Sequence, residues 1–196
     1  SSAASDVYKR QVLKKAAALD IAMICPLHGP VLKEDLGHYI DKYNIWSSYG
    51  VESEGVFIAY ASVYGNTRKA ADMLASKLAD KGVHVTVSDL ARDDWAECLE
   101  DAFRYGKLVL AAPTYNADVF PAMKEFINHL TERNYQNRTI GIIENGSWAP
   151  MAAKVMKGMF EKSKNITFAE NTVTVRSAVN AANEAQIEAL AEELKG

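Results

Sequence analysis

From residue 56 to the C-terminus, short runs of apolar residues alternate with longer segments in which apolar residues recur at helical spacing. A continuous apolar run is typical of a parallel strand that is buried on both faces. The predicted strands are 56–61, 83–87, 108–112, 140–143 and 172–175. Five strand–helix repeats predict an α/β fold with a doubly wound, five-stranded parallel sheet in the order 2-1-3-4-5, because crossovers between parallel strands are right-handed.

The helices between these strands carry their apolar residues on one face. Ala70, Leu74 and Leu78 recur every four residues, and Gly82 is placed to end that helix. The other predicted helices are 94–103, the segment that begins at Pro121, the segment that begins at Pro150, and the C-terminal segment, where Asn183 and Gln186 have the spacing of a capping box.

The first 55 residues do not follow this repeat. Residues 1–11 begin with small polar side chains and are read as a leader that is disordered or an artefact. Residues 12–46 contain helical patterns and one short apolar strand, whereas 47–55 hold two glycines, three serines and few apolar residues. We therefore predict a linker at 47–55 and a separate domain at 56–196.

Composition excludes several classes of function. The net charge is −3 and the chain has no Lys/Arg run, so we expect no nucleic-acid partner. We expect no membrane partner, because no apolar stretch reaches the roughly 18 to 20 residues that span a bilayer. The N-terminus lacks the pattern of a secretory signal, so a cytoplasmic location is expected. Cys25 and Cys98 lie far apart and are read as two reduced cysteines.

The loop after the first predicted strand has the features of a phosphate site. In doubly wound sheets a ligand binds beyond the carboxyl ends of the first and third strands. A glycine for a tight turn lies between hydroxyl-bearing residues, and a helix N-terminus, which favours anions, follows directly. The spacing differs from nucleoside-triphosphate and dinucleotide motifs. A plain helix cap at Asn66 or Thr67 would explain this loop alone equally well. The loop consists of Ser62, Val63, Tyr64, Gly65, Asn66 and Thr67.

Two further loops at the same edge contain aromatic residues. A planar redox-active ring would use such residues for stacking and nearby backbone groups for hydrogen bonds. Each aromatic alone is also explained by ordinary packing, but the agreement of three loops at one edge favours a ligand site. The loops are Pro113, Thr114, Tyr115 and Asn116 after the third strand, and Asn145, Gly146, Ser147 and Trp148 after the fourth.

These three loops resemble the flavin-binding loops of the flavodoxin family, and the resemblance covers the chain from residue 56 onward. It implies a flavodoxin-like fold that binds flavin mononucleotide (FMN). The first loop would hold the phosphate through Ser62, Tyr64, Asn66 and Thr67, and the other two would line the isoalloxazine ring. The fifth strand has no long insertion, so the domain is similar to the short-chain type of flavodoxin.

A second resemblance lies upstream. The segment 24–31, ICPLHGPV, followed by Tyr39 to Trp46, resembles the junction in flavodiiron proteins, also called A-type flavoproteins. In that family a metallo-β-lactamase-like domain with a diiron site precedes the flavodoxin domain, and His28 matches an iron ligand. The family's other ligands, in an H-x-E-x-D-H motif and further upstream, have no counterpart here. Residues 12–46 are thus interpreted as the C-terminal remnant of a metallo-β-lactamase-like domain with an incomplete metal site.

The resemblance implies an FMN-binding electron-transfer domain of a flavodiiron oxidoreductase. The full-length parent would reduce dioxygen or nitric oxide at its diiron site with electrons from a small carrier such as rubredoxin, and would form a head-to-tail homodimer. This chain alone is expected to lack the diiron catalytic site. Two alternatives remain at this point: a stand-alone short-chain flavodoxin-type electron carrier, and a flavodoxin-like fold that has lost FMN.

Overall fold

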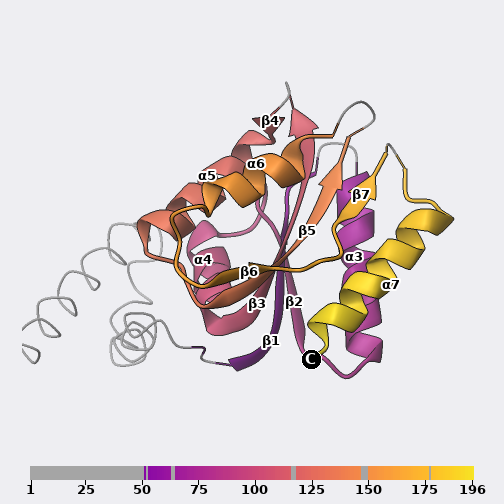
Figure 1. Ribbon diagram of the computed structural model, residues 1–196, viewed down its shortest axis with the longest axis horizontal. Helices are drawn as coiled ribbons and strands as arrows, with labels where there is room; N and C mark the ends of the chain where they lie inside the picture. Colours follow the sequence, from indigo (N-terminus) through magenta and orange to yellow (C-terminus); the bar gives the residue numbers. More distant parts are fainter. Residues whose placement is uncertain (1–50, 52, 63–64, 116–117, 147–149, 177) are drawn as a thin grey trace, which may run out of the picture. The chain divides into compact units, whose positions relative to one another are not determined.

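The computed structural model describes residues 51, 53–62, 65–115, 118–146, 150–176 and 178–196 (Figure 1). The expectations for the leader 1–11, for the remnant 12–46 with His28, and for 47–50 and 52 of the linker lie outside the described residues. Ser53–Gly196 form one compact unit.

A predominantly parallel sheet is the centre of this unit (Figure 1). Its main path is β2-β1-β3-β5-β6, while β7 pairs with β5 and β4 pairs with β3. The predicted order 2-1-3-4-5 is confirmed, with β6 and β7 sharing the fifth position. The strands are β1 (Ser53–Tyr60), β2 (Val85–Asp89), β3 (Tyr105–Tyr115), β4 (Asp118–Val119), β5 (Arg138–Asn145), β6 (Ile166–Phe168) and β7 (Val173–Val175).

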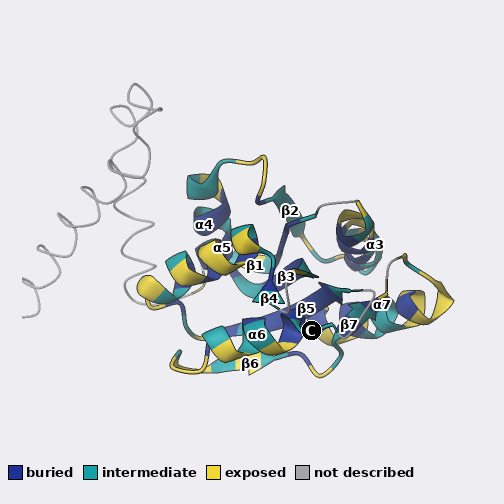
Figure 2. Cartoon of the chain, turned by 90° about the horizontal axis from the view of Figure 1, so that it is seen from above, coloured by how far each residue is buried: buried dark blue, intermediate teal, exposed yellow. Residues whose placement is uncertain are grey.

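Helices cover both faces of the sheet, as the continuous apolar strands require (Figures 1 and 2). Helices α3 (Asn66–Asp80) and α7 (Ala181–Leu194) lie together on one face. Helices α4 (Trp95–Arg104), α5 (Pro121–Glu132) and α6 (Ala152–Met159) lie on the other. Val56, Ile58 and Tyr60 pack into the core beneath α3 and α7, so the alternate residues of β1 point to the second helix layer.

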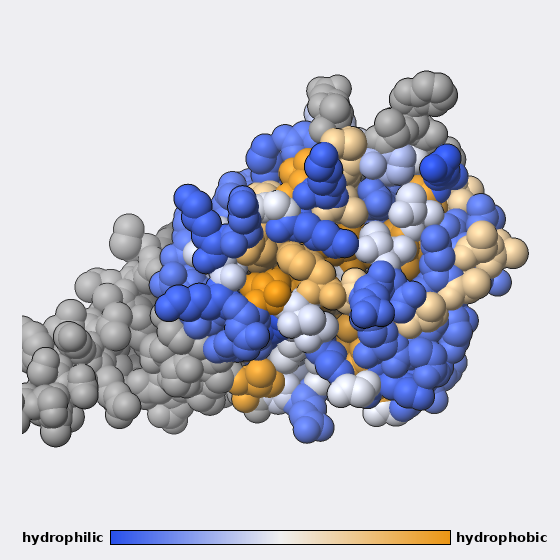
Figure 3. All heavy atoms as spheres, viewed as in Figure 1, coloured by the Kyte–Doolittle hydropathy of each residue, from blue (hydrophilic) through white to orange (hydrophobic). Residues whose placement is uncertain are grey.

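Most large apolar side chains are in the interior. The face in Figure 3 is covered largely by hydrophilic side chains, with smaller hydrophobic areas between them. Among the described residues, the exposed large hydrophobic ones are Val51 and Tyr115. The exposure of Tyr115 matters for function because it lies at the carboxyl end of β3, where a ligand was expected.

The fifth position of the sheet is divided, which the sequence did not predict. β6 pairs with residues 138–140 of β5, and β7 rejoins β5 at Ile143. Between them, the backbone N–H groups of Glu170 and Asn171 donate to the carboxylate of Glu193 in α7, at 2.7 and 3.0 Å. These backbone groups are therefore satisfied by a side chain and not by the neighbouring strand.

A short antiparallel hairpin at the end of β3 was also not predicted. Thr114 and Tyr115 pair with Val119 and Asp118 of β4. The Asp118 carboxylate accepts a hydrogen bond from the N–H of Val119 at 2.7 Å, and the Phe120 N–H donates to the Pro113 carbonyl at 3.1 Å. Local side-chain bonds and a returning turn thus make this strand pair, which is too short to give a periodic pattern.

Helix ends agree with the sequence at some positions and differ at others. The first helix ends before Gly82, which has φ +81°, as predicted. Asp94 caps α4 by accepting from the N–H of Ala96 at 2.8 Å. The expected capping box at Asn183 and Gln186 was wrong by one turn, because Asn180 is the N-cap of α7 and Asn183 is its partner. Asparagine at the partner position takes the role usual for Glu or Gln.

An ion-pair cluster joins α3 to α7. Lys81 Nζ lies 2.6 Å from a carboxylate oxygen of Glu188 and 2.6 Å from one of Glu192. Lys195 also pairs with Glu192, and hydrogen bonds from Lys195 and then Lys81 lower the pKa of Glu192 to about 2.

Glu192 is expected to give the folded protein a small acid-dependent stabilisation. Its folded pKa lies below the ordinary value of 4.5, so the contribution is present above pH 4.5 and is lost as pH falls toward 2. The contribution is small because the pairs are exposed, and added salt should reduce it further. The free energy of unfolding, measured with urea across this pH range, should therefore fall less steeply with decreasing pH for Glu192→Gln than for wild type. The same pH dependence in both proteins would contradict the assignment.

Candidate functional site

The parallel register brings the predicted loops to one edge of the sheet. Tyr60 of β1 lies opposite Ala111 of β3, and Pro113 lies opposite Asn145 of β5. Asn145 in turn lies opposite Val175. The loops after β1, β3, β5 and β7 therefore begin side by side at the carboxyl edge.

A hydrogen bond between two of its own residues stabilises the first loop. The N–H of Gly65 donates to Ser62 Oγ at 3.0 Å, and Gly65 has φ +84°, a conformation that glycine adopts without strain. Gly65 is also the N-cap of α3, whose first turn contains no acidic residue. Because Ser62 Oγ accepts this bond, its own hydrogen can be donated to a ligand.

The N-terminus of α3 differs from those of most other helices at this edge. The N-cap of α3 is a glycine, which has no side chain to accept a hydrogen bond, whereas α4 and α7 are capped by the side chains of Asp94 and Asn180. α5 also has no side-chain cap, but its first residue, Pro121, has no N–H to offer. The N-terminus of α3 is therefore suited to an anion, since its N-cap brings no competing side chain and the helix dipole favours negative charge.

The first and third loops meet at Thr67 and Asn145. The Asn145 side-chain amide donates to Thr67 Oγ1 at 3.4 Å, and Thr67 is only 1% exposed. The Thr67 hydroxyl hydrogen therefore remains for a second acceptor, such as a phosphate oxygen. The structure thus brings together two predicted site residues, one from the first turn of α3 and one from the end of β5.

Tyr115 offers an uncovered aromatic ring at the same edge. Its side chain is 52% exposed and meets the ring of Phe120 edge to face, with centroids 6.1 Å apart. Phe120 supports the Tyr115 ring from one side, so the Tyr115 ring can stack on a planar ligand. That Tyr115 lines a flavin ring stays a prediction.

The Thr114 hydroxyl takes part in capping α6. Its Oγ1 accepts hydrogen bonds from the N–H groups of Met151 and Ala152, at 3.0 and 3.2 Å. α6 consequently begins at Ala152 and not at the predicted Pro150. The sequence did not predict this cap, and the place of Thr114 among the residues that line the flavin stays a prediction. The sequence gives no local signal for this helix cap, because Thr114 and the start of α6 are separated by more than thirty residues.

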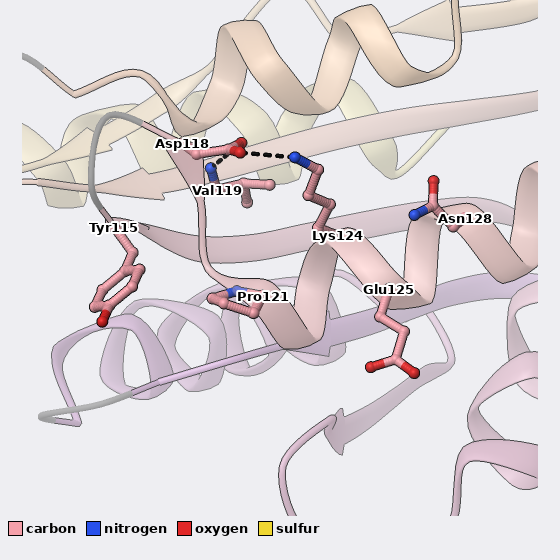
Figure 4. Close-up of a pocket in the computed structure, with 7 residues that line it drawn as sticks. All are labelled: Tyr115, Asp118, Val119, Pro121, Lys124, Glu125 and Asn128. Atoms are coloured by element: carbon pink, nitrogen blue, oxygen red, sulfur yellow. Dashed lines mark hydrogen bonds and ion pairs between the residues drawn. The ribbon is translucent and has the colours of Figure 1, made fainter.

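A pocket of about 440 Å³ lies beside Tyr115 and the β4 hairpin (Figure 4). Lys124 Nζ donates to the Asp118 carboxylate across it at 2.7 Å, and this bond holds the pKa of Asp118 below its usual value. The lining residues are Tyr115, Asp118, Val119, Pro121, Lys124, Glu125 and Asn128. Sequence patterns could not indicate this pocket, since β4 was not predicted.

Several predicted site residues lie outside the described residues: Val63, Tyr64, Asn116, Ser147, Trp148 and His28. Their assignments stay predictions. Within the described ranges, no group of three or more His, Cys, Asp or Glu side chains is arranged to hold a metal ion. In the same ranges, no helix combines the length and apolarity needed to cross a membrane.

Comparison with known proteins identifies the family of this domain. Residues 57–176 match the family model described as a flavodoxin domain. The chain belongs to the flavodoxin family. A nitric oxide reductase from Moorella thermoacetica is 25% identical over 158 residues, which cover 81% of this chain and 39% of that protein.

Solved structures show the same fold. Rubredoxin oxygen:oxidoreductase from Desulfovibrio gigas superimposes with a TM-score of 0.72 at 19% identity, covering 82% of this chain and 39% of that one. A flavo di-iron protein from Thermotoga maritima, solved as a point mutant, gives a TM-score of 0.66 at 21% identity, covering 83% and 40%. The likeness to flavodiiron proteins is thus confirmed. This flavodoxin-family chain spans less than half the length of the curated relatives that it matches.

Proposed function

We propose that this chain is the FMN-binding electron-transfer domain of a flavodiiron oxidoreductase. One observation carries the choice over a stand-alone flavodoxin-type carrier. The match to the Moorella nitric oxide reductase is longer than the unit Ser53–Gly196, so it extends to residues before Ser53. A relative of flavodoxin alone would not be expected to match there.

The geometry of the carboxyl edge fits FMN. The N-terminus of α3, with its glycine N-cap and the hydroxyls of Ser62 and Thr67, suits a phosphate. The exposed ring of Tyr115 suits the isoalloxazine, and Pro113 and Gly146 border the same edge. Asn66, Tyr64, Asn116, Ser147 and Trp148 complete the proposed set. Bound FMN supplies a redox centre, and the chain's part is to hold and orient it.

The finer assignments concern the full-length parent. We propose that the parent carries a diiron site to which His28 contributes, and that it reduces dioxygen or nitric oxide. The names of the Desulfovibrio and Moorella proteins support these two substrates. A small redox carrier of the rubredoxin type as donor, a head-to-tail homodimer and a cytoplasmic location belong to the same proposal. The upstream reading frame of the gene tests it, because a stand-alone carrier would have no metallo-β-lactamase-like domain there.

The purified chain is expected to bind one FMN. Its absorbance spectrum should show flavin, and apoprotein should quench the fluorescence of added FMN to an endpoint of one FMN per chain. The Gly65→Ala variant should bind more weakly, because alanine is strained at φ +84° although its Cβ would meet no atom within 4 Å. A colourless protein that does not quench FMN fluorescence would support the alternative of a fold that has lost its flavin.

A further inference from the structure

The N-terminus of α6 is capped by side chains from two neighbouring strands. Thr114 of β3 accepts from the N–H groups of Met151 and Ala152, as described above. Glu144 of β5 accepts from the N–H of Ala153 at 3.4 Å through Oε1. The N–H groups of the N-cap Met151 and of the first two helical residues, Ala152 and Ala153, are therefore satisfied by side chains from outside the helix.

The inner part of this cap is buried, whereas Thr114 and Met151 are of intermediate exposure. Ala152 is fully buried, Ala153 is 8% exposed and Glu144 is 7% exposed. Water cannot readily replace a lost partner at buried N–H groups, so each missing bond would leave them unsatisfied. The N-terminus of α6 should therefore move or unwind if Thr114 or Glu144 lost its acceptor oxygen.

Glu144 also extends the connection to the last helix. Thr174 Oγ1 of β7 donates to Glu144 Oε2 at 3.2 Å, and the Asn183 side-chain amide of α7 donates to the Thr174 carbonyl at 2.7 Å. A chain of hydrogen bonds thus runs from α7 through β7 to β5 and the start of α6. The carboxyl group of Glu144 lies at the centre of this chain, and hydrogen-bond networks whose members are satisfied rigidify the residues that they join.

The third loop begins and ends against these same residues. A Cβ added to Gly146 would lie 3.2 Å from Pro150 Cβ and 3.3 Å from Thr114 Oγ1. The two described ends of the third loop, Gly146 and Pro150, therefore approach each other closely beside the Thr114 hydroxyl. The Gly146 N–H donates to the Val175 carbonyl at 3.0 Å, which fixes the first of these ends to β7.

We propose that Thr114 and Glu144 are positioning residues for the flavin ring, acting through the third loop without contacting the cofactor. The assignment rests on the proposed function, because it supposes that the third loop lines the isoalloxazine. It differs from the sequence-based role of Thr114 as a ring contact, and it adds Glu144, which no motif singled out. The first loop would select the phosphate, whereas this pair would set the orientation and affinity of the ring.

Thr114→Val removes the acceptor and keeps the shape of the side chain, so it is the main test. Affinities of the apoprotein for FMN and for riboflavin should fall by the same factor, on the order of tenfold or more, since riboflavin has the ring but no phosphate. The visible circular dichroism of the bound flavin should change, because it reports the surroundings of the ring. Thr114→Ser should restore both readouts.

Glu144 gives a second, independent pair of variants. Glu144→Ala should act like Thr114→Val, whereas Glu144→Gln keeps an oxygen for the Ala153 N–H and should remain near wild type. Lys154→Ala, an exposed change on α6, is the matched control and should alter neither readout. If either main variant fails to fold, the other and its conservative partner still decide the question.

The outcomes separate this inference from the proposed function. A wild-type protein that binds no flavin would overturn the proposed function and this assignment with it. Wild-type binding with unchanged affinities and dichroism in Thr114→Val and Glu144→Ala would overturn the assignment alone, even if the apoprotein melted at a lower temperature. Weakening of FMN but not of riboflavin would also overturn it, since the residues would then serve the phosphate.

Discussion

Thr67→Val is expected to lower the affinity for FMN by about ten- to a hundredfold while leaving riboflavin binding nearly unchanged, since a hydrogen bond to a charged group contributes roughly 1.5 to 3 kcal/mol. Thr67 lies in the first turn of α3, and its Oγ1 already accepts from the Asn145 amide. The remaining hydroxyl hydrogen would be donated to the phosphate, and its low exposure of 1% keeps water from competing. Fluorescence titration with both ligands measures the two affinities.

Thr67→Ser is the control for this variant. Serine keeps the hydroxyl and loses only a methyl group, so FMN affinity should return close to that of wild type. Equal weakening of FMN and riboflavin by Thr67→Val would instead indicate that the loop itself was disturbed, and the phosphate role would then be rejected.

Phe126→Ala should reduce the free energy of unfolding by about 3 to 5 kcal/mol, because it deletes a large buried ring and leaves a cavity that the core fills only in part. Phe126 is fully buried on α5 and meets the ring of Trp95 on α4 edge to face, with centroids 5.9 Å apart. Trp95 is fixed in turn by its indole N–H, which donates to the Leu90 carbonyl at 2.8 Å. The change therefore removes a contact that joins two helices of the same layer.

Urea unfolding followed by circular dichroism measures this loss. Asn128→Ala, an exposed change two residues along α5, should leave the unfolding free energy within about 0.5 kcal/mol of wild type. A loss below about 1 kcal/mol for Phe126→Ala would mean that the helix layer repacks around the vacated space, contrary to the close packing expected of a buried core.

The N-termini of α3 and α6 differ in which residues cap them, and this difference supports the proposal of a phosphate at α3. Both follow a strand at the same edge, but α6 receives Thr114 and Glu144 at its first N–H groups, whereas α3 begins at a glycine without a capping side chain. The sequence alone showed the glycine and the hydroxyls of the first loop. It could not show that α6 was already satisfied, because its caps come from other strands.

The order of the strands, the helices between them and the edge that bears the loops followed from local patterns. Apolar runs such as 56–61, the helical spacing of Ala70, Leu74 and Leu78, and the turn glycine at 82 depend on neighbours within one or two turns, which the sequence displays directly. The three candidate segments could be found for the same reason, since each lies at or just after the end of a recognisable strand.

Contacts between distant residues were decided only by the tertiary structure. Glu193 of α7 accepts hydrogen bonds from the backbone N–H groups between β6 and β7, where the edge strand is interrupted. Thr114 of β3 accepts a hydrogen bond from the Met151 N–H, at the residue before α6. The bond between Asn145 and Thr67 joins loops that are almost eighty residues apart. In each case one side chain forms hydrogen bonds with backbone or hydroxyl groups elsewhere in the chain. The packing of the layers determines which residues become partners, and this packing leaves no periodic signal in the sequence.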